Sequence, residues 1–172
     1  MRMFNRFFNA HHSPIGAYAS FTLGYPGGSG GFDLEMARPP GQNVFIGVES
    51  RDGKVFQALP FFGSVEDESK RYDVEKTDDT GGAKRREEVS RDFRLSTDTW
   101  SAGDLTFTLY SPVLPVPDPD TAGEEELKRA LVPAIVAELT VDNTRGERTR
   151  RAFFGYQGSD PYSPMRRLDD TA

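Results

Sequence analysis

Cysteine is absent from this chain of 172 residues, and histidine and tryptophan are scarce, with two copies and one copy. Without cysteine, thiolate catalysis, thiolate zinc sites, iron–sulfur clusters and disulfides are all excluded. The two histidines, His11 and His12, are adjacent, and adjacent residues of a strand point to opposite faces. We therefore expect no metal site. A ring hydrogen-bonded within the protein is the expected role of these histidines, and a polar contact to a ligand is the alternative.

Positive charge is in deficit, and long hydrophobic runs are missing. Lys and Arg number 21 against 27 Asp and Glu, which gives a net charge of −6. Because nucleic-acid binders usually display a basic face, this balance predicts no nucleic-acid partner. No stretch approaches the roughly 18 apolar residues of a membrane helix. Asn5, Arg6 and Asn9 interrupt the apolar region that a signal peptide would need, so we expect a soluble, cytoplasmic protein.

Large aliphatic and phenylalanine residues are also limited. Val, Ile, Leu and Phe make up about 22% of the chain, just above the roughly 20% below which disorder is expected. The 17 glycines and 12 prolines separate short apolar runs, which is typical of an all-β protein. The predicted strands are Ala17 to Leu23, Asn43 to Ser50, Lys54 to Leu59, Arg91 to Thr97, Leu105 to Ser111, Ile135 to Asp142 and Thr149 to Tyr156.

Period-two alternation is clearest from residue 105 to residue 110, where Leu105, Phe107 and Leu109 share one face. From Ile135 to Val141 every second residue is likewise apolar on one side. Turn residues predict hairpins at three places, each of which ends in or contains glycine. These turns are Ser50 to Gly53, Ser101 to Asp104, which follows a strand ending near Trp100, and Asn143 to Gly146.

Three segments do not fit the strand pattern. Residues Thr121 to Leu131 predict a helix, with Thr121 as the capping residue and Glu124 to Glu126 at the positive end of the dipole. Residues 64–90 hold 15 charged side chains in 27 positions and predict a long charged surface loop. The glycine-rich segment Gly24 to Gly31 lacks the following helix that a dinucleotide fingerprint requires.

No residue is predicted to be catalytic from its local pattern. Ser13 precedes a proline and lies in no nucleophile elbow. A glycosidase needs two carboxyl groups about 5 to 9.5 Å apart, with one kept protonated by an apolar setting. The acidic runs of this chain, such as Glu66 to Glu68 and Asp78-Asp79, lie among charged or glycine residues and look solvated. The residues alone therefore indicate only a β-rich domain.

Several long motifs carry a family resemblance. These are FNAHHSPIGAYASFTLG at residues 8–24, LEMARPP at 34–40, QNVFIGVES at 42–50, DESKRYD at 67–73, TDTWSAGDLTFTLYSP at 97–112 and RAFFGYQGSDPYSPMRRLDD at 151–170. In this order they resemble the amino-terminal part of glycoside hydrolase family 52 β-xylosidases. The resemblance runs nearly end to end and is weakest from Lys76 to Arg86.

The resemblance implies an antiparallel β-sandwich that precedes a much larger helical barrel. It implies retaining hydrolysis of β-1,4-xylo-oligosaccharides in xylan breakdown, without metal or organic cofactor. In the family both catalytic carboxylates lie in the barrel, so no residue of this chain is expected to be catalytic. We expect residues 1–172 to form the sandwich domain, incomplete at its carboxyl end, with the barrel as its partner and a homodimer as a possible assembly.

Four polar residues inside the best-matching motifs are candidates for the substrate pocket or the domain interface. They are His11, His12, Arg71 and Tyr72. Two other functions stay open at this point: a freestanding carbohydrate-binding module, in which Trp100 or a tyrosine would stack on sugar, and a purely structural or interaction domain. We expect each of these aromatic side chains to lie in the core or at its rim.

Overall fold

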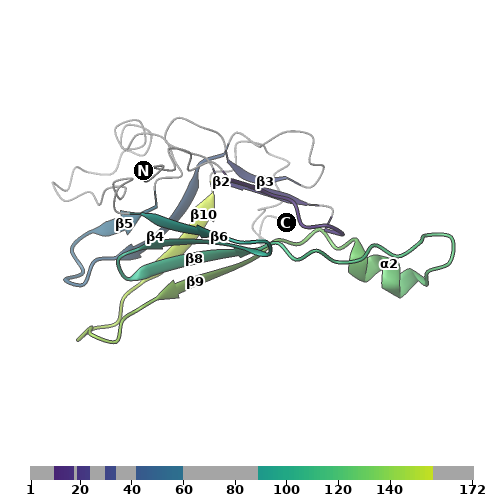
Figure 1. The fold of residues 1–172 in the computed structure, drawn as a ribbon. Coiled ribbons are helices and arrows are strands. Elements are labelled where there is room, and N and C mark those ends of the chain that lie inside the picture. The colour runs from purple at the N-terminus through teal and green to yellow at the C-terminus, as the bar shows by residue number, and fades with distance from the viewer. Residues whose placement is uncertain (1–9, 18, 24–29, 34–41, 60–88, 157–172) are drawn as a thin grey trace, which may run out of the picture.

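The computed structural model describes residues 10–17, 19–23, 30–33, 42–59 and 89–156. Within these ranges the chain forms ten strands and one short helix (Figure 1). The strands are β1 (Ala10–His12), β2 (Ser20–Leu23), β3 (Gly31–Asp33), β4 (Val44–Glu49), β5 (Phe56–Ala58), β6 (Ser90–Phe93), β7 (Thr97–Ala102), β8 (Leu105–Tyr110), β9 (Val136–Val141) and β10 (Ala152–Tyr156). The helix is α2 (Glu124–Ala130).

The strands form three sheets with antiparallel pairing throughout. Their orders are β1-β2-β3, β10-β4-β5 and β6-β7-β8-β9. The prediction of an all-β, antiparallel fold is therefore confirmed, whereas the closed two-sheet sandwich stays a prediction. Among the described residues no helix has the length and apolar character needed to cross a membrane.

One predicted strand is in fact two. The segment Arg91 to Thr97 is split between β6 and β7, because the Arg94 amide donates to the Thr97 carbonyl at 2.8 Å and turns the chain back on itself. Trp100 lies in the middle of β7, not at the end of the preceding strand. The predicted charged loop, residues 64–90, lies outside the described residues except at its end, where Ser90 already begins β6.

Two of the three predicted hairpins are confirmed. The turn at Gly53, with φ +76°, joins β4 to β5, and the turn at Gly103, with φ +60°, joins β7 to β8. The third prediction is wrong. Asn143 to Gly146 does form a turn, but β9 pairs with β8 whereas β10 pairs with β4, so the turn leads from one sheet to another. The long-range pairing with β4 decides where β10 lies.

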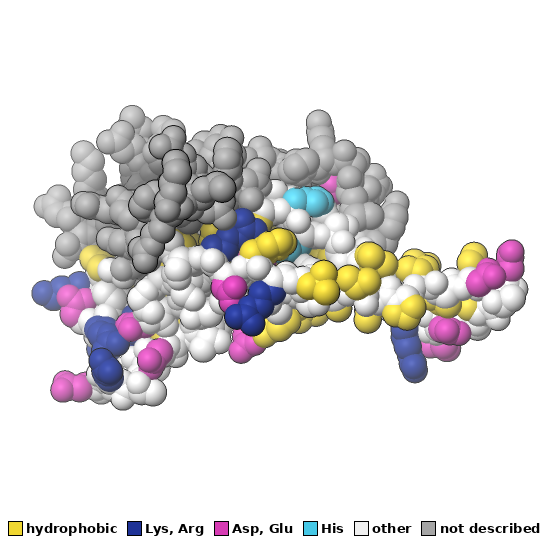
Figure 2. Space-filling model, viewed as in Figure 1, with side chains coloured by type: hydrophobic (Ala, Val, Ile, Leu, Met, Phe, Trp, Pro, Cys, Tyr) yellow, Lys and Arg dark blue, Asp and Glu magenta, His cyan; other side chains and the backbone are white. Residues whose placement is uncertain are grey.

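The segment between β8 and β9, residues 111–135, leaves the sheets as an arm that carries α2 (Figures 1 and 2). The helix is shorter than predicted and begins after Gly123 without a side-chain cap. Thr121 does not cap it, because the N-cap position is Gly123, and Thr121 belongs to a preceding turn in which its amide and that of Ala122 bond to the Asp118 carbonyl. The predicted placement of Glu124–Glu126 at the positive end of the dipole is confirmed, since they lie in the first turn, and Lys128 and Arg129 lie in the last.

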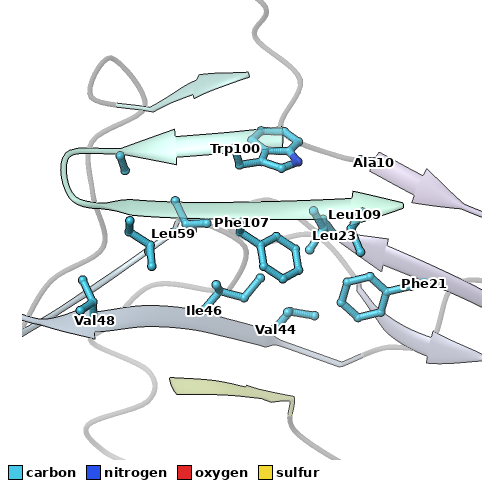
Figure 3. Packing of buried hydrophobic residues seen from close by; sticks show 12 residues of the cluster. Ala10, Phe21, Leu23, Val44, Ile46, Val48, Leu59, Trp100, Phe107 and Leu109 are labelled. Carbon is cyan, nitrogen blue, oxygen red and sulfur yellow. The ribbon is translucent and has the colours of Figure 1, made fainter. Parts of the chain in front are cut away.

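The core lies where β4 faces the β7–β8 hairpin, with β2 closing one end (Figure 3). Its largest fully buried side chains are those of Trp100, Phe107, Leu23, Ile46, Leu59 and Leu109. The alternation predicted for β8 is confirmed, because Leu105, Phe107 and Leu109 are buried and the two threonines between them are half-buried. On β9 the same alternation gives a weaker result: Leu139 and Val141 are half-buried, and Ala137 is exposed.

Candidate functional site

The two adjacent histidines lie on β1 and point to opposite faces, as the strand pattern predicts. Residues 10 to 12 pair with β2, so that His11 lies beside Thr22, and the His11 ring Nδ1 is 2.8 Å from the Thr22 hydroxyl. His11 is exposed, whereas His12 is only 5% exposed. The two rings therefore have separate surroundings and cannot bind one ion together.

Buried His12 is part of a polar cluster built around Asp98, which is fully buried. The ring Nε2 of His12 lies 3.0 Å from Asp98 Oδ2, and Nδ1 lies 3.0 Å from the Ser111 hydroxyl. The Arg91 guanidinium donates from Nε at 2.7 Å and from Nη2 at 2.6 Å to the two oxygens of the same carboxylate. We call these four residues the Asp98 cluster; they join β1, β6, β7 and the end of β8.

The local sequence explains why a carboxylate is buried at this point. On β7 every second residue faces the core, which places Asp98 on the same side as Trp100 and Ala102. A buried carboxylate is tolerated only when it is paired and hydrogen-bonded. The β6–β7 register places Arg91 opposite Trp100, which is two residues from Asp98 on the same face of β7, and from there the guanidinium reaches the carboxylate.

The hydrogen bonds fix the charge state of Asp98. Burial alone would raise the pKa of this carboxyl, but hydrogen bonds from His12 and Arg91 and the charge of Arg91 lower the pKa below its usual value. Asp98 is therefore an ionised acceptor, so His12 must donate from Nε2. In the neutral ring Nδ1 then accepts from the Ser111 hydroxyl.

The order Ser111, His12, Asp98 resembles a nucleophile, a base and an orienting carboxylate. The burial argues for a structural role instead. Arg91 occupies both oxygens of Asp98 with charged hydrogen bonds, and His12 is almost fully enclosed. The cluster therefore joins strands together, and its role is to neutralise and hydrogen-bond the buried Asp98 carboxylate.

Trp100 belongs to the same region and is 1% exposed. The Arg91 guanidinium carbon lies 4.5 Å from the centre of the Trp100 ring, with Phe93 contacting the same guanidinium at 5.1 Å. Because its ring is enclosed, Trp100 cannot stack on a sugar in this structure. This finding removes one of the residues on which a carbohydrate-binding module would depend.

A second charged cluster lies at the β4–β5 and β7–β8 turns. The Asp104 carboxylate accepts from Arg51 Nη2 at 2.7 Å and from Arg150 Nη1 at 2.9 Å. The hydrogen bond from Arg51, followed by that from Arg150, outweighs burial and lowers the pKa of Asp104 to about 2. Arg150 is 4% exposed and also donates to the Glu49 carbonyl.

Glu49 is the second buried carboxylate with charged partners, whereas Asp104 is partly exposed. Its side chain is 3% exposed and lies 3.2 Å from Arg151 and 3.3 Å from Arg148. The hydrogen bond from Arg151 is the main cause of its lowered pKa. Asp98, Asp104 and Glu49 are thus all held in the ionised form, which is the opposite of what a general acid requires.

An apolar groove of about 420 Å³ opens between β9 and β10. Its lining consists of Phe21, Phe32, Phe107, Leu109, Ile135, Ala137, Leu139 and Phe154. These side chains offer no hydrogen-bond donors or acceptors, and a sugar ring needs several of them to be held in one orientation. Within the described residues this groove is therefore suited to apolar contacts.

The structure places two of the four predicted site residues. His11 is at the surface, His12 is inside the Asp98 cluster, and Arg71 and Tyr72 lie outside the described residues. Sequence reasoning missed Asp98 and Arg91. The period of two along β7 places Asp98 on the same face as Trp100, which is the core face. A buried carboxylate on that face requires a cationic partner.

No group of three or more His, Asp or Glu side chains in the described ranges is arranged to hold a metal ion. The charged clusters pair each carboxylate with arginine or histidine, which leaves the oxygens occupied by donors.

Comparison with known proteins adds what the geometry alone does not give. A family model described as Glycosyl hydrolase family 52 matches residues 21–172. The chain is 61% identical to a protein named Beta-xylosidase from Geobacillus stearothermophilus, over 97% of this chain and 25% of that relative. A second Beta-xylosidase from the same organism is 51% identical over 96% of this chain and 29% of its own length. The chain thus spans less than a third of either relative.

Proposed function

Because the chain belongs to glycoside hydrolase family 52, we propose that it is the amino-terminal, non-catalytic part of a β-xylosidase that acts on xylo-oligosaccharides. The observation that carries this proposal is the 61% identity to a protein named Beta-xylosidase across nearly the whole chain. The proposed reaction is hydrolysis with retention, in which one carboxylate attacks the sugar and another protonates the leaving group.

Three of the described carboxylates, each paired with arginine, support a non-catalytic role. A retaining glycosidase needs a protonated acid about 5 to 5.5 Å from its nucleophile. In this chain Asp98, Asp104 and Glu49 are bound by arginines, and the pKa of each is lowered. The relatives are three to four times as long as their match to this chain, which leaves ample length for a separate catalytic domain.

The proposed role of this part is to support the catalytic domain and to shape the substrate pocket where the two parts meet. His11, His12, Arg71 and Tyr72 are the proposed contact residues. The exposure of His11 supports a direct contact, whereas buried His12 would act by holding β1 in place. A homodimer of the whole enzyme is part of the same proposal.

The experiment is a chimeric enzyme in which residues 1–172 replace the matching segment of the 61% identical relative. We expect this chimera to hydrolyse an aryl β-xyloside with retention, observed by NMR as the anomer released first. Loss of hydrolysis in a folded chimera would contradict the proposed role, and release of the inverted anomer would contradict the retaining mechanism.

A further inference from the structure

The arm formed by residues 111–135 exposes apolar side chains along its length. Figure 2 shows them as a continuous yellow band that runs from the body of the molecule to α2. We call the following five residues the arm strip, each of them between 47% and 62% exposed: Val113, Leu114, Val116, Leu131 and Val132. Phe93 and Leu95, near the base of the arm, are exposed as well.

The apolar side chains of the arm gather on one part of the surface instead of being scattered singly. Single exposed hydrophobic residues are ordinary, but a contiguous apolar patch marks a site of interaction. The helix on the arm buries none of its residues, so the arm contributes little to the core of the described part. None of the five arm-strip side chains belongs to the core cluster or packs against it, whereas Ile135 at the end of the arm does pack against it.

The arm is also built to keep its shape. Five prolines, at positions 112, 115, 117, 119 and 133, fix φ along it and restrict its unbound conformations. At its base Ile15 and Val113 form a parallel bridge, and the Ala130 carbonyl lies against Gly16. A Cβ at Gly16 would collide with that carbonyl, and the φ of +90° also favours glycine. A pre-organised segment loses less entropy when it docks.

We infer that the arm strip docks on the part of the longer polypeptide that lies outside these 172 residues. The inference rests on the proposed function, because it requires a longer enzyme. The chain covers 25% and 29% of the two relatives, so most of such an enzyme is available as an intramolecular partner. A covalently attached partner is present at an effective concentration near the millimolar range, which favours it over a second copy.

The test compares single cysteines introduced into a protein segment that has none. Val116→Cys lies in the arm strip, and Val136→Cys, on the outer face of β9, is the matched control with similar exposure, 51% against 57%. Each is placed in the chimera and in the 172-residue chain, and the rate of maleimide labelling is read by peptide mass spectrometry. Leu131→Cys serves as a second arm variant.

In the chimera we expect labelling at residues 116 and 131 to be at least about tenfold slower than at residue 136. The reason is that the arm must separate from its docking surface before the thiol can react. In the 172-residue chain the three rates should agree within about threefold, since all three side chains are exposed there. Equal rates in the chimera would overturn the inference. Protection that appears in the 172-residue chain, rises with its concentration and accompanies a dimer in sedimentation would overturn it in favour of a second copy.

The outcome does not depend on catalysis. A chimera that is protected at residue 116 but inactive on xyloside would refute the proposed function alone. An active chimera without protection would refute the docking alone.

Discussion

The Arg91 guanidinium on β6 donates two hydrogen bonds, of 2.7 and 2.6 Å, to the fully buried carboxylate of Asp98 on β7. His12 of β1 binds the same carboxylate from another sheet. This shared acceptor connects the amino-terminal strand to a hairpin more than 80 residues later in the chain. The two sheets are therefore joined by a buried hydrogen bond to a shared carboxylate as well as by apolar packing.

Asp98→Asn should lower the free energy of unfolding by about 3 to 5 kcal/mol, because it removes the negative charge that Arg91 and His12 pair with inside the fold. The matched control is Asp92→Asn on β6, where an exposed carboxylate pairs with exposed Arg94. This change should cost less than about 1 kcal/mol. Urea unfolding followed by circular dichroism measures both, and equal effects would show that burial of the Asp98 cluster does not stabilise the fold.

Asp104 should make stability fall in acid. Its pKa of about 2 in the folded chain lies below the ordinary 3.8, so the unfolded chain binds protons more readily between these values. The stabilisation is complete above about pH 4 and is lost as the pH falls towards 2. Asp104→Asn should lower stability at pH 7 by about 1 to 3 kcal/mol, since buried Arg150 loses an ionic partner, and should flatten the pH dependence in acid. An unchanged acid profile would contradict this account.

Two glycines in the β4–β10 ladder should respond differently to alanine. A Cβ at Gly47 would meet the Phe153 ring and the Gln57 carbonyl, whereas a Cβ at Gly155 meets nothing within 4 Å. Gly47→Ala should therefore lower the free energy of unfolding by about 1 to 3 kcal/mol. Gly155→Ala should leave it unchanged or raise it by up to about 1 kcal/mol, since alanine restricts the unfolded chain. The denaturant midpoints of the two variants measure this difference. A lower midpoint for Gly155→Ala than for Gly47→Ala would refute the β4–β10 pairing.

Alanine substitutions of the two histidines should have different effects, with His12→Ala acting mainly on stability and His11→Ala mainly on the kinetics of the chimera. His12→Ala removes a buried partner of Asp98 and should lower the free energy of unfolding by about 1 to 3 kcal/mol. His11→Ala, at an exposed position, removes only the ring hydrogen bond to Thr22 and should lower the free energy of unfolding by about 0.5 to 1 kcal/mol. In the chimera, His11→Ala should raise KM or lower kcat for an aryl xyloside. Unchanged kinetics with His11→Ala would remove His11 from the proposed contact residues.

The sequence predicted those elements whose signal is local. The alternation of Leu105, Phe107 and Leu109 and the glycine turns at Gly53 and Gly103 come from neighbouring residues, and the structure contains all of them. It did not predict β1 and β3, because strands of three residues are too short to show a period of two.

Long-range pairing explains the remaining differences. The partner of β10 is β4, about 100 residues earlier, and no turn residue indicates that choice. The Asp98 cluster likewise depends on residues 12, 91 and 111, which the fold brings together. The period of two along β7 could have placed the Asp98 carboxylate on the core face. It could not have identified His12, Arg91 and Ser111 as the other members of the cluster.

The central claim is that this chain supports a glycosidase without carrying the reacting carboxylates. It is tested most directly by measuring xylose release from an aryl β-xyloside by the folded 172-residue chain and by the chimera, at equal concentration. We expect hydrolysis by the chimera and none above background by the 172-residue chain. Xylose release by the 172-residue chain that is abolished by Glu49→Gln or Asp104→Asn, with the fold retained, would contradict the claim.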